Sequence, residues 1–207
     1  MIDFFFEPYK TASTFQIFME FLAFVFGIVS VWFAKKENIW VYPTGLIATI
    51  ITTYLLWIAG YLGDMLINGY FTVMSIYGWI NWAKKTDTND NLPITRTTHN
   101  EKLTGILLFL ITIFVVFAIY KGVGQEIKND NYIDIISSGI FFTGMWYMAR
   151  KKIENWTLWI IGDIIVTPLY AYRGLGMLSL QYLIFTIMAV SAYLEWKKIL
   201  NNNPQPL

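Results

Sequence analysis

The chain has 207 residues, of which 56% are hydrophobic and only 14% charged, and its net charge is +1. Soluble domains carry about a quarter charged residues, so the composition excludes an ordinary soluble domain. No basic cluster indicates nucleic-acid binding. The chain has no cysteine and a single histidine, which excludes disulfides and leaves no ligand set for zinc or haem. We therefore expect an all-α integral membrane protein without a metal or cofactor.

Seven apolar segments follow one another along the chain. A helix needs roughly 20 mostly apolar residues to cross the hydrocarbon of a bilayer. The polar stretch 84–102 is predicted to be a solvated loop, and the acidic N-terminus does not resemble a cleaved signal peptide. The predicted transmembrane helices cover residues 14–34, 39–59, 62–83, 103–120, 132–149, 154–172 and 176–196.

Basic residues divide unevenly between the two sides of this arrangement. Seven spans place the chain ends on opposite sides of the membrane, and the side with more Lys and Arg is normally cytoplasmic. The N-terminal side holds four of the 15 basic residues and the other side holds eleven. We predict an external N-terminus and a cytoplasmic C-terminus.

The first and last three helices resemble each other, as in transporters built from repeats. Residues 34–40 are similar to residues 149–156, with Trp40 matched to Trp156, and Trp82 and Trp196 end the two units. Both units start on the same side, so the repeats are parallel. We predict one membrane domain, 1–207, with three-helix units at 14–83 and 132–196 and a linking helix at 103–120.

The third helix carries a row of polar and aromatic residues on one face. Spacings of three and four residues place side chains on one side of a helix, and polar groups within a membrane usually face a cavity or a partner. The alternative is that the hydroxyl groups bond their own helix and that Gly78 permits close helix packing. The row consists of Asn68, Thr72, Ser75, Trp79 and Trp82.

The sixth helix has the clearest pattern. Trp156, Trp159, Asp163 and Thr167 form one stripe, and Asp163 lies about 10 Å along the helix from Trp156. Two indoles and a carboxylate suit a flat ligand that is cationic or hydroxylated. The alternative is that Asp163 bonds another helix and the tryptophans form an interfacial belt.

The seventh helix offers Gln181, whose amide can recognise sugar hydroxyl groups. A retinal receptor needs a lysine in the last span, and 176–196 has none. The chain lacks the cluster of reactive groups that an enzyme would need. It also has no phosphate-binding loop of the kind that ATP hydrolysis requires. A membrane receptor or scaffold stays open as an alternative. The predicted substrate-binding residues are Trp156, Trp159, Asp163, Asn68, Ser75, Trp79 and Gln181.

Two segments together resemble the PnuC family of vitamin transporters. They are residues 154–175, with Trp156, Trp159 and Asp163, and residues 77–82, which read Tyr-Gly-Trp-Ile-Asn-Trp. The resemblance covers essentially the whole chain. It implies a fold like that of the SWEET sugar transporters, a place in the bacterial inner membrane, and a homotrimer.

The same resemblance implies facilitated diffusion of nicotinamide riboside, trapped when a cytoplasmic kinase phosphorylates it. Other members of the family carry thiamine, riboflavin or deoxynucleosides. Trp156, Trp159 and Asp163 would then bind the vitamin, with Asn68 and Gln181 facing them. Nicotinamide riboside carriers usually have Gln at the position of Asn68 and Asn at that of Asp163. The carboxylate favours a cation, which leaves nicotinamide riboside and thiamine open.

Overall fold

A computed structural model describes residues 12–58, 62–84, 92–122, 129–173 and 176–202. The predicted all-α class and the seven helices are confirmed, with helix ends within a few residues of the expected ones. The helices are α2 (Thr14–Lys35), α3 (Val41–Ile58), α4 (Leu62–Ala83), α5 (His99–Gly122), α6 (Asn129–Ala149), α7 (Glu154–Tyr172) and α8 (Gly176–Asn202).

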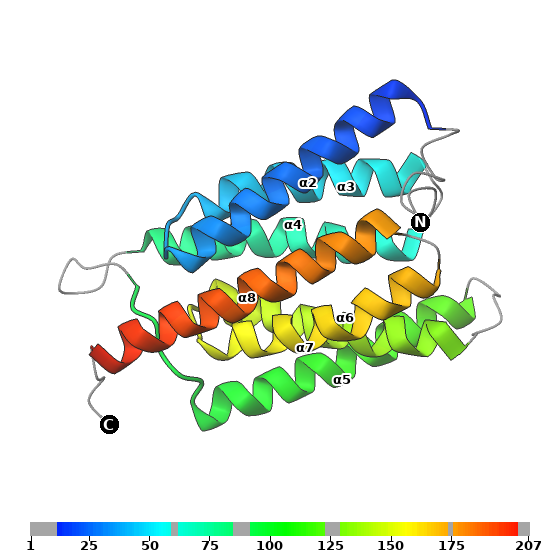
Figure 1. Ribbon diagram of the computed structural model, residues 1–207. Coiled ribbons are helices and arrows are strands. Elements are labelled where there is room, and N and C mark those ends of the chain that lie inside the picture. The colour runs from blue at the N-terminus through cyan, green and yellow to red at the C-terminus, as the bar shows by residue number, and fades with distance from the viewer. Residues whose placement is uncertain (1–11, 59–61, 85–91, 123–128, 174–175, 203–207) are drawn as a thin grey trace.

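The axes of the seven helices lie roughly along one common axis, and the helices pack side by side (Figure 1). By length and composition, α2, α3, α5 and α8 are apolar enough to cross a membrane. The other three helices have 22, 21 and 19 residues, so they are long enough as well. They carry more polar side chains, several of which are buried within the bundle.

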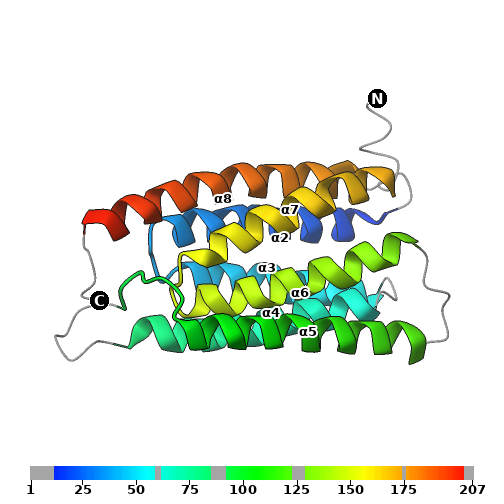
Figure 2. The same cartoon turned by 90° about the horizontal axis from the view of Figure 1, so that it is seen from below.

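Six of the helices form a closed ring. Neighbouring helices pack in the order α2, α3, α4, α6, α7 and α8, and α8 packs back on α2. Helix α5 lies outside this ring against α6 (Figure 2), with Gly105 facing the ring of Tyr147. The ring has two junctions between the three-helix units, α4 with α6 and α2 with α8, which we call the seams.

The loops that follow α2 and α6 have the same structure, 114 residues apart along the chain. Asn38 donates its backbone N–H to Phe33 and Lys152 donates to Tyr147, both at 2.9 Å. Glu37 and Lys151 adopt left-handed φ angles of 55° and 53°, which non-glycine residues rarely do. We call the end of the bundle that contains these two loops the corner end.

Each seam is bridged at the corner end by an indole–carbonyl bond, and the tryptophan that makes it also packs on an aromatic ring of its own unit. The indole of Trp82 donates to the carbonyl of Met148 at 3.1 Å, and that of Trp196 donates to Ala34 at 3.2 Å. Tyr42 packs edge-on against Trp82 at 5.2 Å, and Trp156 packs edge-on against Trp196 at 5.5 Å. Each seam is therefore bridged by an indole–carbonyl bond, and each donor indole is packed against an aromatic ring within its own three-helix unit.

This register corrects the sequence match of Trp40 with Trp156. The hydrogen bonds of the two loops align Trp156 with Tyr42 instead. Trp40 is 58% exposed, whereas Tyr42 and Trp156 are buried. The similar order of residues in the two loops concealed a shift of two positions.

A cluster of buried hydrophobic residues lies at the corner end. It includes the aromatic pair of each unit and the helix ends to which the two indoles bond. Close packing of this kind leaves little room between the helices. The corner end of the ring is closed by side chains, which include Ala34, Tyr42, Trp82, Met148, Trp156 and Trp196.

Candidate functional site

The polar stripe of α7 lies inside the bundle, as its spacing predicts. Asp163 is buried, with 2% of its surface exposed. Thr167 donates its hydroxyl to the backbone carbonyl of Asp163 at 2.7 Å, so this bond does not involve the Asp163 carboxylate. Among the described residues, no hydrogen bond or ion pair reaches that carboxylate. The stripe thus presents a buried acceptor for which the described part of the chain supplies no donor.

Two donors on the same stripe also lack partners. The indole N–H groups of Trp156 and Trp159 are buried and meet no acceptor in the described part of the chain. Buried polar groups are almost always hydrogen-bonded, because an unmet one costs roughly 1–3 kcal/mol. Three such groups on one face of one helix indicate a place where a polar ligand completes the bonding.

The ring of Trp159 lies at the seam between α4 and α6. It stacks on Phe141 with centroids 5.4 Å apart, and Phe71 of α4 approaches it at 6.1 Å. Beside them, Tyr70 stacks on Phe142 at 3.7 Å. The site therefore has aromatic walls from both three-helix units, which suits a flat ring.

The predicted residues of α4 are divided by the structure. Ser75 is buried, and Asn68 is half-buried one turn from Thr72, whose hydroxyl bonds Thr49 of α3 at 3.0 Å. Trp79, one turn after Ser75, is 40% exposed. The structure thus keeps Asn68 and Ser75 within the bundle, whereas Trp79, on the same face of α4, is more exposed.

Gln181 lies at the other seam. Its side-chain nitrogen would be 3.8 Å from a Cβ added at Gly27 of α2. Its neighbour Tyr182 contacts Phe141, which in turn stacks on Trp159. A continuous row of rings therefore connects the surroundings of Gln181 with those of Trp159.

Tyr42 is a candidate that the sequence did not suggest. It is the counterpart of Trp156 in the first unit, and its hydroxyl is buried without a partner among the described residues. Its ring fills the space beside Gly78. The signal was present in the repeat, but the shift of two residues concealed it.

The stretch after α4 is a loop, as predicted, but its described part is only partly solvated, because Ile94 and Thr97 are buried. Residues 92–98, which we call the strap, cross the corner end of the bundle, and residues 85–91 lie outside the described chain. The backbone of Thr95 bonds Lys151 at 3.1 Å and Ile153 at 3.0 Å, and Ile94 is buried. These bonds and the buried side chain hold the strap against the loop between α6 and α7.

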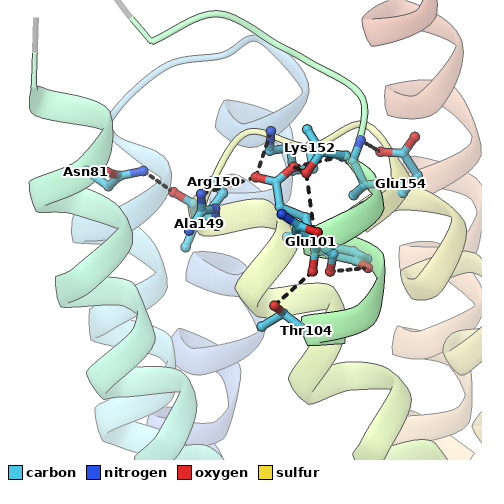
Figure 3. A network of polar contacts seen from close by, with 11 residues as sticks. Asn81, Glu101, Thr104, Ala149, Arg150, Lys152 and Glu154 are labelled. Atoms are coloured by element: carbon cyan, nitrogen blue, oxygen red, sulfur yellow. Dashed lines mark hydrogen bonds and ion pairs between the residues drawn. The ribbon is translucent and has the colours of Figure 1, made fainter. Parts of the chain in front are cut away.

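Ion pairs reinforce this contact (Figure 3). Glu101 pairs with Lys152 at 2.9 Å and with Arg150 at 3.1 Å. Glu154 accepts the backbone N–H of Thr97 at 3.0 Å. The strap and the start of α5 are thereby tied to the second unit.

Lys151 connects both units at the corner end. Its ammonium group pairs with Glu37 of the first unit at 3.2 Å, bonds the carbonyl of Leu92 at 2.8 Å and lies 4.7 Å from the ring centre of Trp82. Burial lowers the pKa of Lys151, and the nearby Glu37 carboxylate opposes this effect only in part. A buried lysine thus closes the corner end.

A helix bundle that encloses a buried polar and aromatic face, with helices long and apolar enough to cross a bilayer, is the architecture of a membrane transporter. The family model described as "Nicotinamide mononucleotide transporter" matches residues 17–198. The chain therefore belongs to the nicotinamide mononucleotide transporter family.

Known proteins agree with this assignment. The nicotinamide riboside transporter PnuC of Escherichia coli K12 is 25% identical, over 86% of this chain and 84% of its own. The riboflavin/roseoflavin transporter RibM of Streptomyces davaonensis is 18% identical, over 87% and 84%. A crystal structure of the vitamin B3 transporter PnuC covers 89% of this chain and 83% of its own, with a TM-score of 0.72 and 21% identity. These relatives are transporters, not enzymes.

Proposed function

We propose that this chain carries a B-type vitamin with a positively charged ring across the membrane by facilitated diffusion. Nicotinamide riboside is the first candidate cargo and thiamine the alternative. The buried carboxylate of Asp163, with no cation bound to it among the described residues, is the observation that carries this choice. Membership of a family with nicotinamide riboside and riboflavin carriers among its relatives supports a vitamin as cargo.

The chemistry of the site fits a cationic vitamin in three ways. The ring would stack against Trp159, whose face also attracts a cation. The positive charge would balance Asp163 and remove the cost of burying it. The hydroxyl groups of a ribose would meet the amides of Asn68 and Gln181 and the hydroxyl of Ser75, which lie on α4 and α8. Riboflavin has no such charge and would gain less.

The corner end is the side that we assign to the cytoplasm of a bacterial inner membrane. It carries the basic residues of the loops after α2 and α6 and the C-terminal end of α8. The chain has no ATP-binding loop, so net uptake would depend on a cytoplasmic kinase that phosphorylates the released vitamin. The N-terminus would lie outside.

The working unit would be one membrane domain in which residues 14–83 move against residues 132–196 at the two seams. Family resemblance further suggests that three copies assemble. Light scattering of the protein in detergent, corrected for bound detergent, would give about three times the mass of 24.1 kDa for a trimer. A mass of one chain would contradict that part of the proposal.

Binding titrations of the purified protein with nicotinamide riboside, thiamine and riboflavin test the function directly. We expect at least one of the two cations to bind. The substitution Asp163→Ala should lower the affinity for that cation by about 10- to 100-fold, which corresponds to the loss of a hydrogen bond to a charged group. The same variant should change riboflavin binding less.

Trp40→Ala is a control, because Trp40 is 58% exposed and is not among the candidate site residues, whereas Trp159→Ala removes a wall of the site. We expect the first variant to keep the affinity and the second to lose it. Binding of none of the three vitamins would reject the proposed function. Unchanged affinity in Asp163→Ala would reject the proposed site.

A further inference from the structure

The helices that surround Asp163 supply no cation. Helix α7 packs on α6 and α8, and α6 has no titratable group between Asp134 and Tyr147. At the depth of Asp163, α8 contributes Tyr182, and α4, whose Phe71 contacts Trp159, contributes Tyr70. Tyr70 donates its hydroxyl to the carbonyl of Phe142 at 3.1 Å.

The charged groups at the two ends of the ring are engaged elsewhere. Arg173 binds Asp134 at 2.7 Å, and Lys152 binds Glu101 at 2.9 Å. Both basic residues lie roughly 15 Å from Asp163 along the axis of α7. Across the ring, Lys35 at the corner end of α2 donates to Ser191 at 2.7 Å, and Glu20 lies toward the opposite end.

An ionised carboxylate in this position would be costly. Burying an unpaired charge within a membrane protein costs several kcal/mol, and a carboxyl group avoids this cost when it binds a proton. A cationic ligand beside the carboxylate removes the same cost without the proton. The proton and the ring cation are therefore alternative ways to neutralise one group.

We propose that a proton and the cationic cargo compete for Asp163, so that binding of one cation releases one proton. The carboxyl O–H bond breaks, its proton passes to water, and the carboxylate remains beside the ring cation. No other bond forms, and the net charge of the site is the same when loaded and when empty. This inference rests on the proposed function and deepens it.

Competition with protons gives the cargo affinity a definite pH dependence. Protons are scarcer at higher pH, so a cation binds more tightly as the pH rises, by up to about tenfold per pH unit while the empty site is protonated. A neutral ligand such as riboflavin leaves the proton in place. Its affinity should not follow pH in this way.

Calorimetry of the purified full-length protein tests the exchange. Thiamine and nicotinamide riboside are titrated in two buffers of different ionisation enthalpy, at several values between about pH 5.5 and 8.5. We expect one proton released for each cation bound. Asp163→Asn should release none and bind with an affinity that does not depend on pH. Glu195→Gln, which changes an exposed acid on α8 that pairs with Lys36, should release the proton as the unchanged protein does.

Infrared difference spectra give a second readout. The band of a protonated carboxyl group should disappear when the cation binds, and it should be absent from Asp163→Asn. Cation binding without proton release would overturn the exchange while leaving the proposed function intact. Binding of no vitamin at all would overturn both.

Discussion

Gly78 shows how a single small residue determines the packing at the corner end. It lies on α4 against the ring of Tyr42, and a Cβ added there would overlap that ring. Tyr42 is buried and packs against Trp82, so the ring has no free space into which it could move. The absence of a side chain at position 78 is what allows the aromatic pair of the first unit.

Gly78→Ala should therefore destabilise the protein, by about 1–3 kcal/mol for an overpacked core. Gly69, on the same helix, has nothing within 4 Å of an added Cβ. Gly69→Ala should be neutral or stabilising, by up to about 1 kcal/mol from helix propensity. Thermal unfolding in detergent measures both. Equal melting temperatures for the two variants would contradict this account of Tyr42.

Lys151 gives the stability a pH dependence that can be assigned to one group. Its pKa is lowered in the folded protein, mainly by burial. The folded state then binds fewer protons than the unfolded state between the lowered pKa and the ordinary value of 10.5. The free energy of unfolding should therefore rise with pH across that window.

Unfolding of the protein and of Lys151→Met, from neutral pH upward, measures this contribution. The difference in stability should move in favour of the unchanged protein as the pH rises toward 10.5. Lys36→Met is the control, because Lys36 is an exposed lysine of the matching loop. A constant difference between the protein and Lys151→Met would show that burial of Lys151 has no such effect.

At the scale of helices, the two seams are the elements that can part. Each is bridged at the corner end by an indole–carbonyl bond, from Trp82 or from Trp196, beside other polar contacts. A hydrogen bond of this kind contributes about 0.5–1.5 kcal/mol. Each indole–carbonyl bond therefore supplies only part of the free energy that holds the corner end closed.

Replacing Trp82→Phe and Trp196→Phe together should make the corner end open more often. The chain has no native cysteine, so Lys36→Cys and Glu195→Cys, which replace an ion pair across the α2 and α8 seam, report on the distance. A short bismaleimide should link them more slowly in the Phe variant. Trp40→Phe, an exposed tryptophan, should leave the rate unchanged. Equal rates in both variants would contradict a role for the indole bonds.

The helices were predictable because each apolar segment is long and ends at charged or turn-forming residues. The buried stripe of α7 was also predictable, because residue spacing alone places Asp163 on the same face of the helix as two indoles. The exposure of Trp79 was not, because the spacing rule fixes a face of α4 but not which neighbour covers it. The strap was missed because its backbone bonds to Lys151 and Ile153 depend on residues far away in the sequence.

At the scale of the whole molecule, the unequal distribution of basic residues predicts one orientation. The test uses a reporter enzyme that is active only in the cytoplasm. Fused after Leu207, it should be active. A second reporter, inserted in the loop between α3 and α4, should report the opposite side. An inactive C-terminal fusion would reverse the orientation and the assignment of the corner end.

The repeated corner has a consequence for how a cargo must sit. Position 49 in the first unit corresponds to position 163 in the second, but it holds a threonine whose hydroxyl already accepts a bond from Thr72. The two units therefore have the same backbone arrangement, but only the second has a carboxylate at this position. Under the proposed function, a cationic vitamin in the centre of the ring would meet a carboxylate on one side only, so it should travel in a single orientation, with its cationic end toward α7.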